Sequence, residues 1–406
     1  MKYLIVTEGT WGDVLPFLYI GRELKNKGKN VTVFTNEYYK NKVLEFGLEF
    51  IQTTNLGTRT RLLSNENLWK PFKGLRFLSE SVAEIFEKSY PIVMDNLDAD
   101  DVVISHAFSF AGKVAADVKK AKQISVLISP IQARTKYDLP VVLNGINPNK
   151  WPSFIKKYFY EFGDLLILNR LTPRSIKSVL KDKKILAEKS FMDYGVSKYL
   201  SIGLWPEWYS PIYKDQKHYL ELAGFPSNVV IEEIEDDELS HWISIGSAPI
   251  VVTLGSGYYF NETLVEMVKE ISSETNERFI VIAQEENFED SDSIIFRRRI
   301  NLTNVLCRSK IFIHHGGAGS CAQAINSGVP SIVLPMSHDQ PDNAQKIFKN
   351  NLGVFINRKN LNKKNLKNEI ENVLRSNTIK QAVIEAKLKC QNIDAIKNAA
   401  EIILEN

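Results

Sequence analysis

Short apolar segments alternate with helical segments along this chain, and the alternation occurs twice. Apolar runs such as KYLIVT and VTVFT alternate with helical segments in the first third, and the order begins again with PIVVTLGSG and FIVIAQ. Strands joined by crossover helices form parallel sheets with helices on both faces. We therefore predict the α/β class, with two Rossmann-like domains whose parallel, doubly wound sheets face each other across a cleft.

At 406 residues the chain is long enough for two domains with complete cores. We predict an N-terminal domain over residues 1–228 and a linker over 229–240, around the acidic run IEEIEDDE. A C-terminal domain is predicted over 241–390, followed by a last helix over 391–406.

The composition excludes several classes of protein. A formal net charge of +3 is too small to make nucleic acid a main partner. Cys307, Cys321 and Cys390 have no paired spacing, so neither a disulfide framework nor a zinc site is expected. Acidic pairs at 98–100 and 290–292 resemble metal ligands, but we expect both to be solvated and predict no essential metal. With no signal peptide and no membrane-spanning run, we expect a soluble cytoplasmic protein.

The stretch from Ile311 to Ala324, IFIHHGGAGSCAQA, is a candidate phosphate site. An apolar strand ends in two histidines, and glycines permit a tight turn before a helix whose N-terminus offers unpaired N–H groups. The helix dipole also favours negative charge there. An ordinary strand-to-helix turn is the alternative, but it gives no reason for two histidines. The predicted pyrophosphate-binding residues are His315, Gly316, Gly317, Ala318, Gly319 and Ser320.

Polar residues follow two further strands of the same half. Ser256 lies between glycines in LGSG, where backbone N–H groups can bind an anion, and a plain turn is the alternative. Asp339 and Gln340 are adjacent in PMSHDQPDN, before a helix expected to start at Pro341 or Asp342. A carboxylate beside an amide suits the vicinal hydroxyls of a sugar. Helix capping is the alternative for both acids, and we prefer it for Asp342.

Two ionisable residues follow strands in the N-terminal half. The loop EGTWGDVLP places Asp13 after the first strand, before a helix expected to open at Pro16 and close near Gly28. Asp13 is predicted to take a proton from a hydroxyl, with Thr10 and Gly12 in the same N-terminal loop. His106, at the end of DVVISH, is a second catalytic candidate, and a structural role is its alternative.

These segments resemble those of the inverting, nucleotide-sugar-dependent glycosyltransferases of family 1, which have two Rossmann-like domains (GT-B). The likeness is greatest to the bacterial branch that includes sterol-type, macrolide-type and glycopeptide-antibiotic enzymes. It covers nearly the whole chain. It is carried by HHGGAGS, GVPSIVLPMSHDQPDNAQ, GTWGDVLPFLYIGRELKNKGKNVTVFT, and SIGLWPEWYSP with the later LAGFP.

The resemblance implies a role for each motif. The turn with His315 and Ser320 would bind the pyrophosphate of a UDP- or dTDP-linked hexose, and Asp339 with Gln340 would hold the sugar hydroxyls. Asp13 would be the general base that activates a hydroxyl of a small, hydrophobic or lipid-like acceptor. A single displacement would invert the configuration, with no cofactor beyond the nucleotide sugar. The last helix, AIKNAAEIILEN, would cross back onto the N-terminal domain.

The sequence departs from the family in one respect. Plant members carry a tryptophan upstream of the motif's histidine for stacking the base, and here Arg297 stands about there. The choice between a uridine and a thymidine donor is therefore open.

Other functions fit part of the sequence. Gly317 to Ala322 also matches the G-x-G-x-x-A pattern of nicotinamide-dependent oxidoreductases, with Asp339 placed as a ribose-binding acid. The paired histidines and the adjacent Asp339 and Gln340 argue against it. Non-hydrolysing nucleotide-sugar epimerases share the two-domain plan, so fold does not decide between them and transferases. An inactive sugar-nucleotide binder is a third alternative, which Asp13 disfavours.

The acceptor is left open. The segment from Trp151 to Leu186 combines aromatic residues with lysines, and it could make a weak peripheral contact with an anionic membrane. We prefer the interpretation in which it lines an acceptor pocket and exposes its lysines to water.

Overall fold

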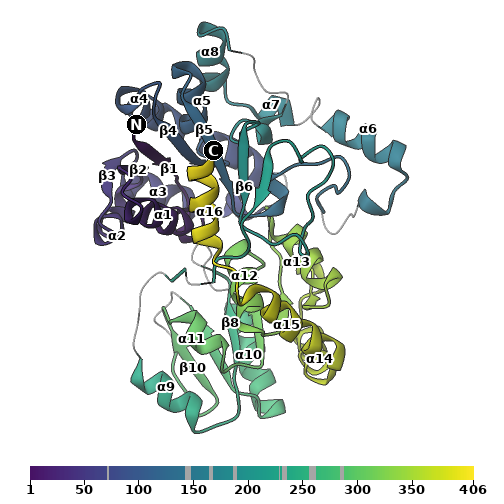
Figure 1. Ribbon diagram of the computed structural model, residues 1–406. Coiled ribbons are helices and arrows are strands. Elements are labelled where there is room, and N and C mark those ends of the chain that lie inside the picture. The colour runs from purple at the N-terminus through teal and green to yellow at the C-terminus, as the bar shows by residue number, and fades with distance from the viewer. Residues whose placement is uncertain are drawn as a thin grey trace. The chain divides into compact units, whose positions relative to one another are not determined.

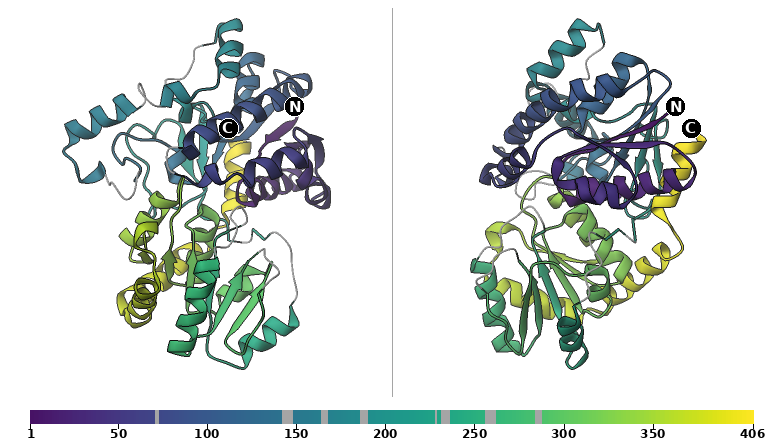
Figure 2. Two further views of the ribbon diagram at one scale, coloured as in Figure 1. Left: turned by 180° about the vertical axis from the view of Figure 1, so that it is seen from behind. Right: turned by 90° about the vertical axis from the view of Figure 1, so that its left-hand side faces the viewer.

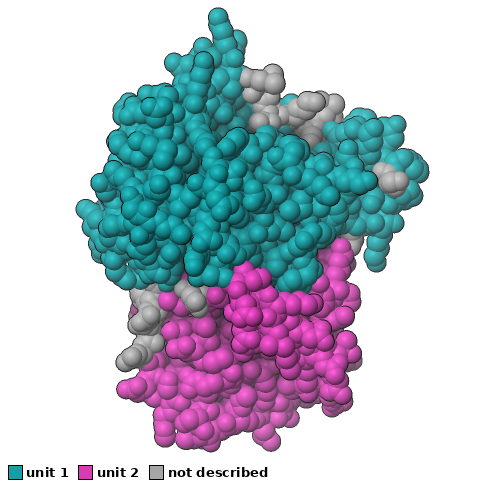
Figure 3. Space-filling view, viewed as in Figure 1, with its two compact units in different colours: residues 1–226, 394–406 teal, residues 227–393 magenta. Residues whose placement is uncertain are grey.

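The computed structural model describes residues 1–70, 73–141, 148–163, 168–185, 190–227, 229–230, 236–255, 262–283 and 288–406. Residues 231–235 of the predicted linker lie outside this part of the chain. The chain divides into two compact units, which Figure 3 shows in different colours. Unit 1 comprises Met1–Pro226 and Asp394–Asn406, and unit 2 comprises Ser227–Ile393. Each is an α/β domain built on a parallel sheet, as predicted (Figure 1).

Unit 1 has a seven-stranded parallel sheet with the strand order β3-β2-β1-β4-β5-β6-β7. Its strands are β1 (Tyr3–Val6), β2 (Val31–Thr35), β3 (Glu49–Gln52), β4 (Val102–His106), β5 (Lys122–Leu127), β6 (Leu200–Gly203) and β7 (Leu220–Leu222). Its α-helices are α1 (Trp11–Asn26), α2 (Lys40–Glu45), α3 (Leu56–Leu63), α4 (Lys73–Asn96), α5 (Phe110–Lys119), α6 (Ser153–Gly163), α7 (Asn169–Leu171), α8 (Arg174–Asp182) and α16 (Ala395–Glu405). Short 3-10 helices are η1 (Glu37–Tyr39), η2 (Glu66–Trp69), η3 (Pro130–Gln132), η4 (Pro148–Lys150) and η6 (Phe191–Asp193).

Unit 2 has a six-stranded parallel sheet with the strand order β10-β9-β8-β11-β12-β13. Its strands are β8 (Ile250–Thr253), β9 (Phe279–Ile282), β10 (Ile294–Arg297), β11 (Ile311–His314), β12 (Ser331–Val333) and β13 (Gly353–Phe355). Its helices are α9 (Asp237–Ser244), α10 (Glu262–Thr275), α11 (Leu302–Leu306), α12 (Ala318–Ser327), α13 (Gln340–Lys349), η7 (Arg358–Asn360), α14 (Lys363–Arg375) and α15 (Asn377–Cys390).

The central strands are buried along their whole length because helices cover both faces of each sheet. Every residue of β1 and β4 is buried, and so is every residue of β8 and β11. In unit 1, one core cluster joins residues of β1 and β4 to residues of α4, α5 and α8. These buried strands hold the residues at their ends in fixed positions.

The last helix, α16, packs against α1 within unit 1, and Figures 1 and 2 show the two helices side by side. Lys27 and Glu401 form an ion pair at 3.6 Å between these helices. The amide of Asn398 donates to the carbonyl oxygen of Ala223 at 3.2 Å. The chain therefore ends on the unit in which it begins.

Each sheet reverses its strand order at one point, between β1 and β4 in unit 1 and between β8 and β11 in unit 2. In open parallel sheets, ligands bind beyond the carboxyl ends of the strands at such points. The residues that follow β1, β4, β8 and β11 are therefore the ones to inspect for chemistry.

The first helix begins earlier than predicted. It starts at Trp11 rather than Pro16, with Thr10 as its N-cap, so Thr10 and Gly12 do not lie in an extended loop. Thr10 and Asp13 form a capping box, which supplies partners for the free N–H groups of the first turn and outweighs the boundary signal of Pro16. Asp13 is consequently held in the first turn of a helix.

Candidate functional site

β11 ends at His314, whose side chain is completely buried. Its Nδ1 accepts a hydrogen bond from the backbone N–H of Gly316 at 3.1 Å, and its ring stacks on Phe312 with the centroids 4.6 Å apart. Burial, and then the neighbouring His315, lower the pKa of His314 to about 3. The imidazole is therefore neutral and carries its proton on Nε2, which has no partner among the described residues.

His315 lies between two glycines. A Cβ on Gly255 would come within 2.5 Å of its Cε1, and a Cβ on Gly317 within 2.5 Å of its Nε2. The half-buried ring can lie here only because both residues lack a side chain. Desolvation lowers the pKa of His315 to about 4, and its Nδ1 has no partner among the described residues. A neutral imidazole with one nitrogen unpaired can donate to an anionic oxygen without adding charge.

The turn after these histidines leads into α12. Gly316 has a φ of +91°, and a Cβ there would lie 2.7 Å from Cγ1 of Val333, so only glycine fits. Gly317 is the N-cap of α12, and nothing lies within 4 Å of the place where a Cβ of Gly319 would be. The first-turn N–H groups of residues 318–320 therefore begin a helix that has no side-chain cap among the described residues. Such an end binds anions.

Asn343 connects this turn to the next polar segment. Its side chain is buried, and its Nδ2 donates to the carbonyl oxygen of Gly316 at 2.9 Å and to Oδ2 of Asp339 at 2.8 Å. The sequence analysis missed this residue. Its spacing of four from Asp339, which puts both on one side of a helix start, is the signal that could have found it.

Asp339 and Gln340 lie at the start of α13, which begins at Gln340, slightly before the predicted position. Asp339 is the N-cap residue, but its side chain makes no capping hydrogen bond. Gln340 is buried, and its Oε1 accepts from the backbone N–H groups of Met336 at 2.8 Å and Ser337 at 3.1 Å. These two bonds fix the amide orientation and leave Nε2 as its donor end.

Asp342 makes a structural ion pair within α13. It lies in the first turn of α13, is buried, and pairs with Lys346 at 3.5 Å. The predicted capping role is replaced by this ion pair, because Asp339 already occupies the N-cap position.

In unit 1, the two carboxylate oxygens of Asp13 have different surroundings. Oδ2 accepts from the backbone N–H of Thr10 at 2.7 Å and from its hydroxyl at 2.8 Å. Gly9, with a φ of +130°, makes room for this oxygen, because a Cβ there would lie 2.5 Å from it. Oδ1 lies 3.6 Å from Nε2 of His106, and the side chain is 25% exposed. One oxygen therefore stabilises the helix, and the other faces a histidine in a partly exposed position.

The structure thus brings Asp13 and His106 together. His106 is buried at the end of β4, and its ring packs edge-on against Phe17 with centroids 5.9 Å apart. Burial lowers the pKa of His106, and the negative charge of Asp13 acts in the opposite direction. A group missed by the sequence analysis, the amide Nε2 of Gln132, lies 3.2 Å from Nε2 of His106. The S-x-x-Q pattern of SPIQ, which forms a capping box at Ser129, is the signal for that residue.

The structure places the remaining candidates neither among the residues around the glycine turn of unit 2 nor in the Asp13 and His106 pair of unit 1. Gly12 lies in the first turn of α1, and a Cβ there would make only an ordinary contact, 3.6 Å from the Thr10 hydroxyl. Ser256 lies outside the described residues. Arg297, at the end of β10, forms ion pairs with three carboxylates. They are Asp236 at 2.7 Å, Glu238 at 2.7 Å and Asp290 at 2.8 Å. The Arg297 guanidinium is therefore already neutralised.

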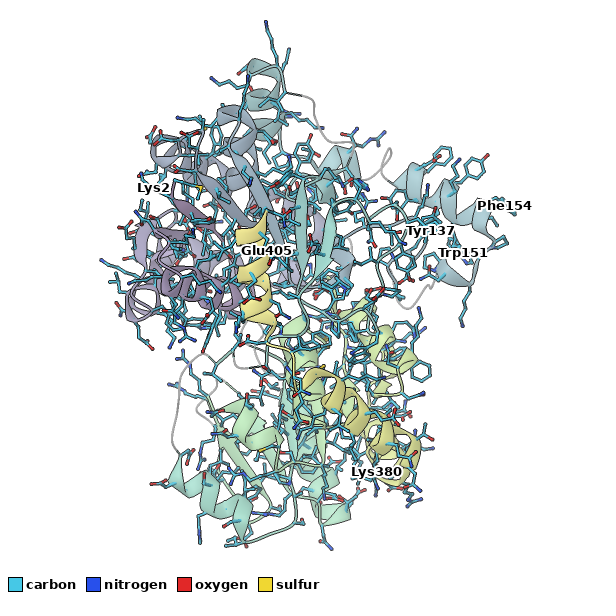
Figure 4. All side chains as sticks on the ribbon, in the orientation of Figure 1. Lys2, Tyr137, Trp151, Phe154, Lys380 and Glu405 are labelled. Atoms are coloured by element: carbon cyan, nitrogen blue, oxygen red, sulfur yellow. The ribbon has the colours of Figure 1, made fainter. Side chains whose placement is uncertain are left out.

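The aromatic segment after residue 150 includes side chains that are largely exposed. On α6, the side chains of Phe154, Tyr158 and Phe162 are 64%, 57% and 53% exposed, so the described residues do not enclose them. Figure 4 shows Phe154 pointing away from the rest of unit 1. Tyr160, on the opposite side of the helix, packs under the guanidinium of Arg134 at 4.6 Å. Within the described residues, no helix is long and apolar enough to cross a membrane.

Two family models match the chain. Residues 3–117 match the glycosyltransferase family 28 N-terminal domain, and residues 268–397 match the erythromycin biosynthesis protein CIII-like C-terminal domain. These matches include the Asp13 and His106 pair in unit 1, and the histidines, the glycine turn and Asp339 in unit 2.

Curated relatives are similar over most of this chain. The sterol 3-beta-glucosyltransferase UGT80A2 of Arabidopsis thaliana is 24% identical over 379 residues, which are 87% of this chain and 57% of that protein. The chain thus spans a little over half the length of that relative. The NDP-glycosyltransferase YjiC of Bacillus subtilis (strain 168) is 24% identical over 373 residues, covering 89% of this chain and 86% of that protein.

Solved structures share the fold over its full length. The glycotransferase of kitacinnamycin superposes with a TM-score of 0.74 at 15% identity, covering 100% of this chain and 98% of the other. The spinosyn rhamnosyltransferase SpnG, complexed with thymidine diphosphate, gives a TM-score of 0.68 at 13% identity and covers 100% of both chains.

Proposed function

We propose that this chain is a glycosyltransferase that transfers a hexose from a UDP- or dTDP-linked donor, with inversion, to a hydroxyl of a small hydrophobic acceptor; its GT-B fold and its two family matches support this. The observation that carries the proposal is the N-terminus of α12, which has no side-chain cap and is preceded by the neutral His315. The family matches favour this reaction over the epimerase and oxidoreductase alternatives.

Unit 2 supplies the donor site in this proposal. The N–H groups of residues 318–320 and the free nitrogen of His315 bind the pyrophosphate, and the Ser320 hydroxyl adds a donor. Preorganised donors that face developing negative charge lower the barrier, because the leaving nucleoside diphosphate gains charge as the glycosidic bond breaks. These neutral donors and the helix dipole provide this stabilisation without requiring a metal ion or a further cofactor.

Asp339 and Gln340 hold the hexose. Asn343 fixes the Asp339 carboxylate relative to the glycine turn, because one amide group bonds to both. Gln340 presents a donor, Nε2, and Asp339 presents an acceptor, which together match two neighbouring hydroxyls of a sugar. The neighbour SpnG, whose structure contains thymidine diphosphate, supports a nucleoside diphosphate as the leaving group.

Asp13 acts as the general base. Its Oδ1 takes the proton of the acceptor hydroxyl as that oxygen forms a bond to the anomeric carbon. The bond from this carbon to the diphosphate oxygen breaks, and its electron pair leaves with the nucleoside diphosphate. A single displacement from the opposite face inverts the anomeric configuration. His106 lies beside Asp13 and affects how well Asp13 performs this step.

The acceptor is hydrophobic or lipid-like in this proposal. One relative is by name a sterol glucosyltransferase, and one neighbour is by title a spinosyn rhamnosyltransferase. The exposed aromatic row of α6 is consistent with an apolar acceptor or with a weak contact to the membrane that contains one.

The test is a thermal-shift screen followed by product analysis. Nucleoside diphosphates and their sugars are added singly, and a ligand at about one hundred times its Kd stabilises the fold by about 2.7 kcal/mol. The stabilising donor is then incubated with sterol, polyketide and glycolipid acceptors, and the anomeric configuration of the product is read by NMR. If no nucleoside diphosphate stabilises the protein, or if the product retains the donor configuration, the proposal is wrong.

A further inference from the structure

The amide of Gln132 has a fixed orientation. Its side chain is buried, and its Oε1 accepts from the backbone N–H of Ile128 at 2.8 Å and of Ser129 at 3.3 Å. Because the oxygen is held by two donors, the NH₂ group must be the end that faces His106, with the two nitrogens 3.2 Å apart.

Unit 2 contains the same arrangement at the equivalent place. Gln132 follows β5, which neighbours β4 and His106, and Gln340 follows β12, which neighbours β11 and His314. Both glutamines accept from the backbone N–H groups three and four residues earlier. In both units the loop therefore fixes the orientation of a buried amide after the strand that neighbours the histidine strand. Gln340 is proposed to use this donor for the sugar, and in unit 1 the donor faces a histidine.

Donors face both nitrogens of the His106 ring. The backbone N–H of Phe108 points at Nδ1 at 3.4 Å, and the Gln132 amide faces Nε2. An imidazolium carries a proton on both nitrogens and accepts no hydrogen bonds, so it would meet a donor on each side, whereas the neutral ring keeps one acceptor nitrogen, which at Nε2 can accept from the Gln132 amide. Also against the ring are the apolar rings of Phe17 and Phe108 and the carboxylate of Asp13. Asp13 is thus the only charged group beside His106 in the described part of the chain.

We propose that Gln132 is a positioning residue that keeps His106 neutral and thereby leaves Oδ1 of Asp13 free to take the acceptor's proton. This inference rests on the proposed role of Asp13 as general base. A charged His106 would pair with the adjacent carboxylate and make it a weaker proton acceptor. With a neutral His106, the proton released by the acceptor hydroxyl goes to Asp13, and no charge builds up on the ring. The burial that lowers the pKa of His106 acts in the same direction.

The substitution Gln132→Glu tests this directly. Glutamate keeps an oxygen for the N–H groups of Ile128 and Ser129, and it replaces the amide donor by an oxygen that attracts a proton on Nε2 of His106. The imidazole signals of His106, identified by their loss in His106→Gln, are followed by NMR from pH 5.5 to 8.5. In the wild-type protein we expect no titration over this range. In Gln132→Glu we expect His106 to titrate within it, with its pKa raised.

Turnover provides the second readout. The fraction of neutral His106 falls about tenfold for each pH unit below its pKa. The kcat of Gln132→Glu should therefore fall about tenfold per pH unit below that pKa, toward pH 5.5, and recover toward pH 8.5. KM for the donor should not change, because Gln132 lies in unit 1. Gln132→Leu, which removes the donor without adding a charge, should show a smaller loss in the same direction.

Gln123→Glu is the matched control. Gln123 is a buried residue of β5 whose Nε2 donates to the hydroxyls of Ser105 at 2.8 Å and Ser125 at 2.9 Å. The substitution introduces the same charge into the same sheet without a contact to His106, so the His106 signals should behave as in the wild-type protein. The inference is wrong if His106 of the wild-type protein titrates near its ordinary pKa. It is also wrong if His106 of the Gln132→Glu protein stays neutral over the whole pH range.

The NMR result needs no substrate. If the NMR titration contradicts the expectation while the protein still transfers a sugar, only the role of Gln132 is refuted. If the NMR titration agrees with the expectation but the protein transfers no sugar, the proposed function is refuted instead.

Discussion

Asp13→Asn separates the structural role of Asp13 from its chemical role, because its two oxygens have different partners. Oδ2 accepts two hydrogen bonds from Thr10, at 2.7 and 2.8 Å, and Oδ1 faces His106. The amide oxygen of asparagine can replace Oδ2 and keep both bonds. The lost charge–dipole interaction at the start of α1 then costs about 0.5 kcal/mol. Asp13→Ala also removes the cap and should cost about 1 kcal/mol more.

The loss of activity should be far larger than the loss of stability. Removing a general base lowers the rate by about 10²- to 10⁴-fold, and asparagine cannot accept the proton. Urea denaturation gives the two free energies of unfolding, and single-turnover glycosyl transfer gives the rate of the chemical step. Stabilisation by the nucleoside diphosphate should be unchanged, since its proposed site lies in unit 2. A folded Asp13→Asn protein that keeps more than about a tenth of the wild-type rate would refute the assignment of the base.

Three further predictions follow from the geometry. Asn343→Leu removes the donor shared by Gly316 and Asp339, and calorimetry should show about tenfold weaker nucleotide-sugar binding, because each buried acceptor loses a partner. The pKa of buried His314 is lowered from 6.5 to about 3, so the unfolded state binds more protons below pH 6.5, and stability falls as the pH drops from there toward 3. Between pH 7.5 and pH 5, His314 should lower the free energy of unfolding, measured by urea denaturation, by about 2 kcal/mol. A His314→Gln protein should lack this decrease. Replacing Phe154 and Phe162 by serine should reduce sedimentation with vesicles of phosphatidylglycerol, and equal sedimentation of both proteins, or none by the wild-type protein, would remove the membrane contact.

The sequence predicts the sheets well because their strands are buried on both faces. A strand such as β11 is recognisable as a short apolar run, and the glycines that follow it mark a sharp turn before α12. Gly316 illustrates why this signal is strong, because its positive φ and its contact with Val333 leave no alternative residue. Local backbone requirements of this kind are encoded in adjacent residues, so they can be read directly.

The supporting residues are harder to predict because their contacts are tertiary. The side chain of Gln132 contacts His106, which is 26 residues away in the sequence. The side chain of Asn343 donates to Gly316, which is 27 residues away. The spacing within the sequence does not show which buried amide will face which ring or carbonyl. The orientation of α6 has the same origin. Its sequence combines aromatic residues with lysines, but only the packing of Tyr160 against Arg134 shows which side faces the rest of unit 1.

The repeated glutamine loop indicates how one fold can serve two different ligands. In both units a backbone N–H faces Nδ1 of a strand-end histidine, that of Phe108 at His106 and that of Gly316 at His314. In unit 2 the next residue is His315, and glycines leave the helix end open to an anion. In unit 1 the histidine instead faces the carboxylate of Asp13, which caps α1, the helix that follows the neighbouring strand β1. The same strand-end histidine is thus accompanied by a second imidazole and a glycine turn in one unit, which suits an anionic ligand, and by a carboxylate in the other, which suits a proton donor.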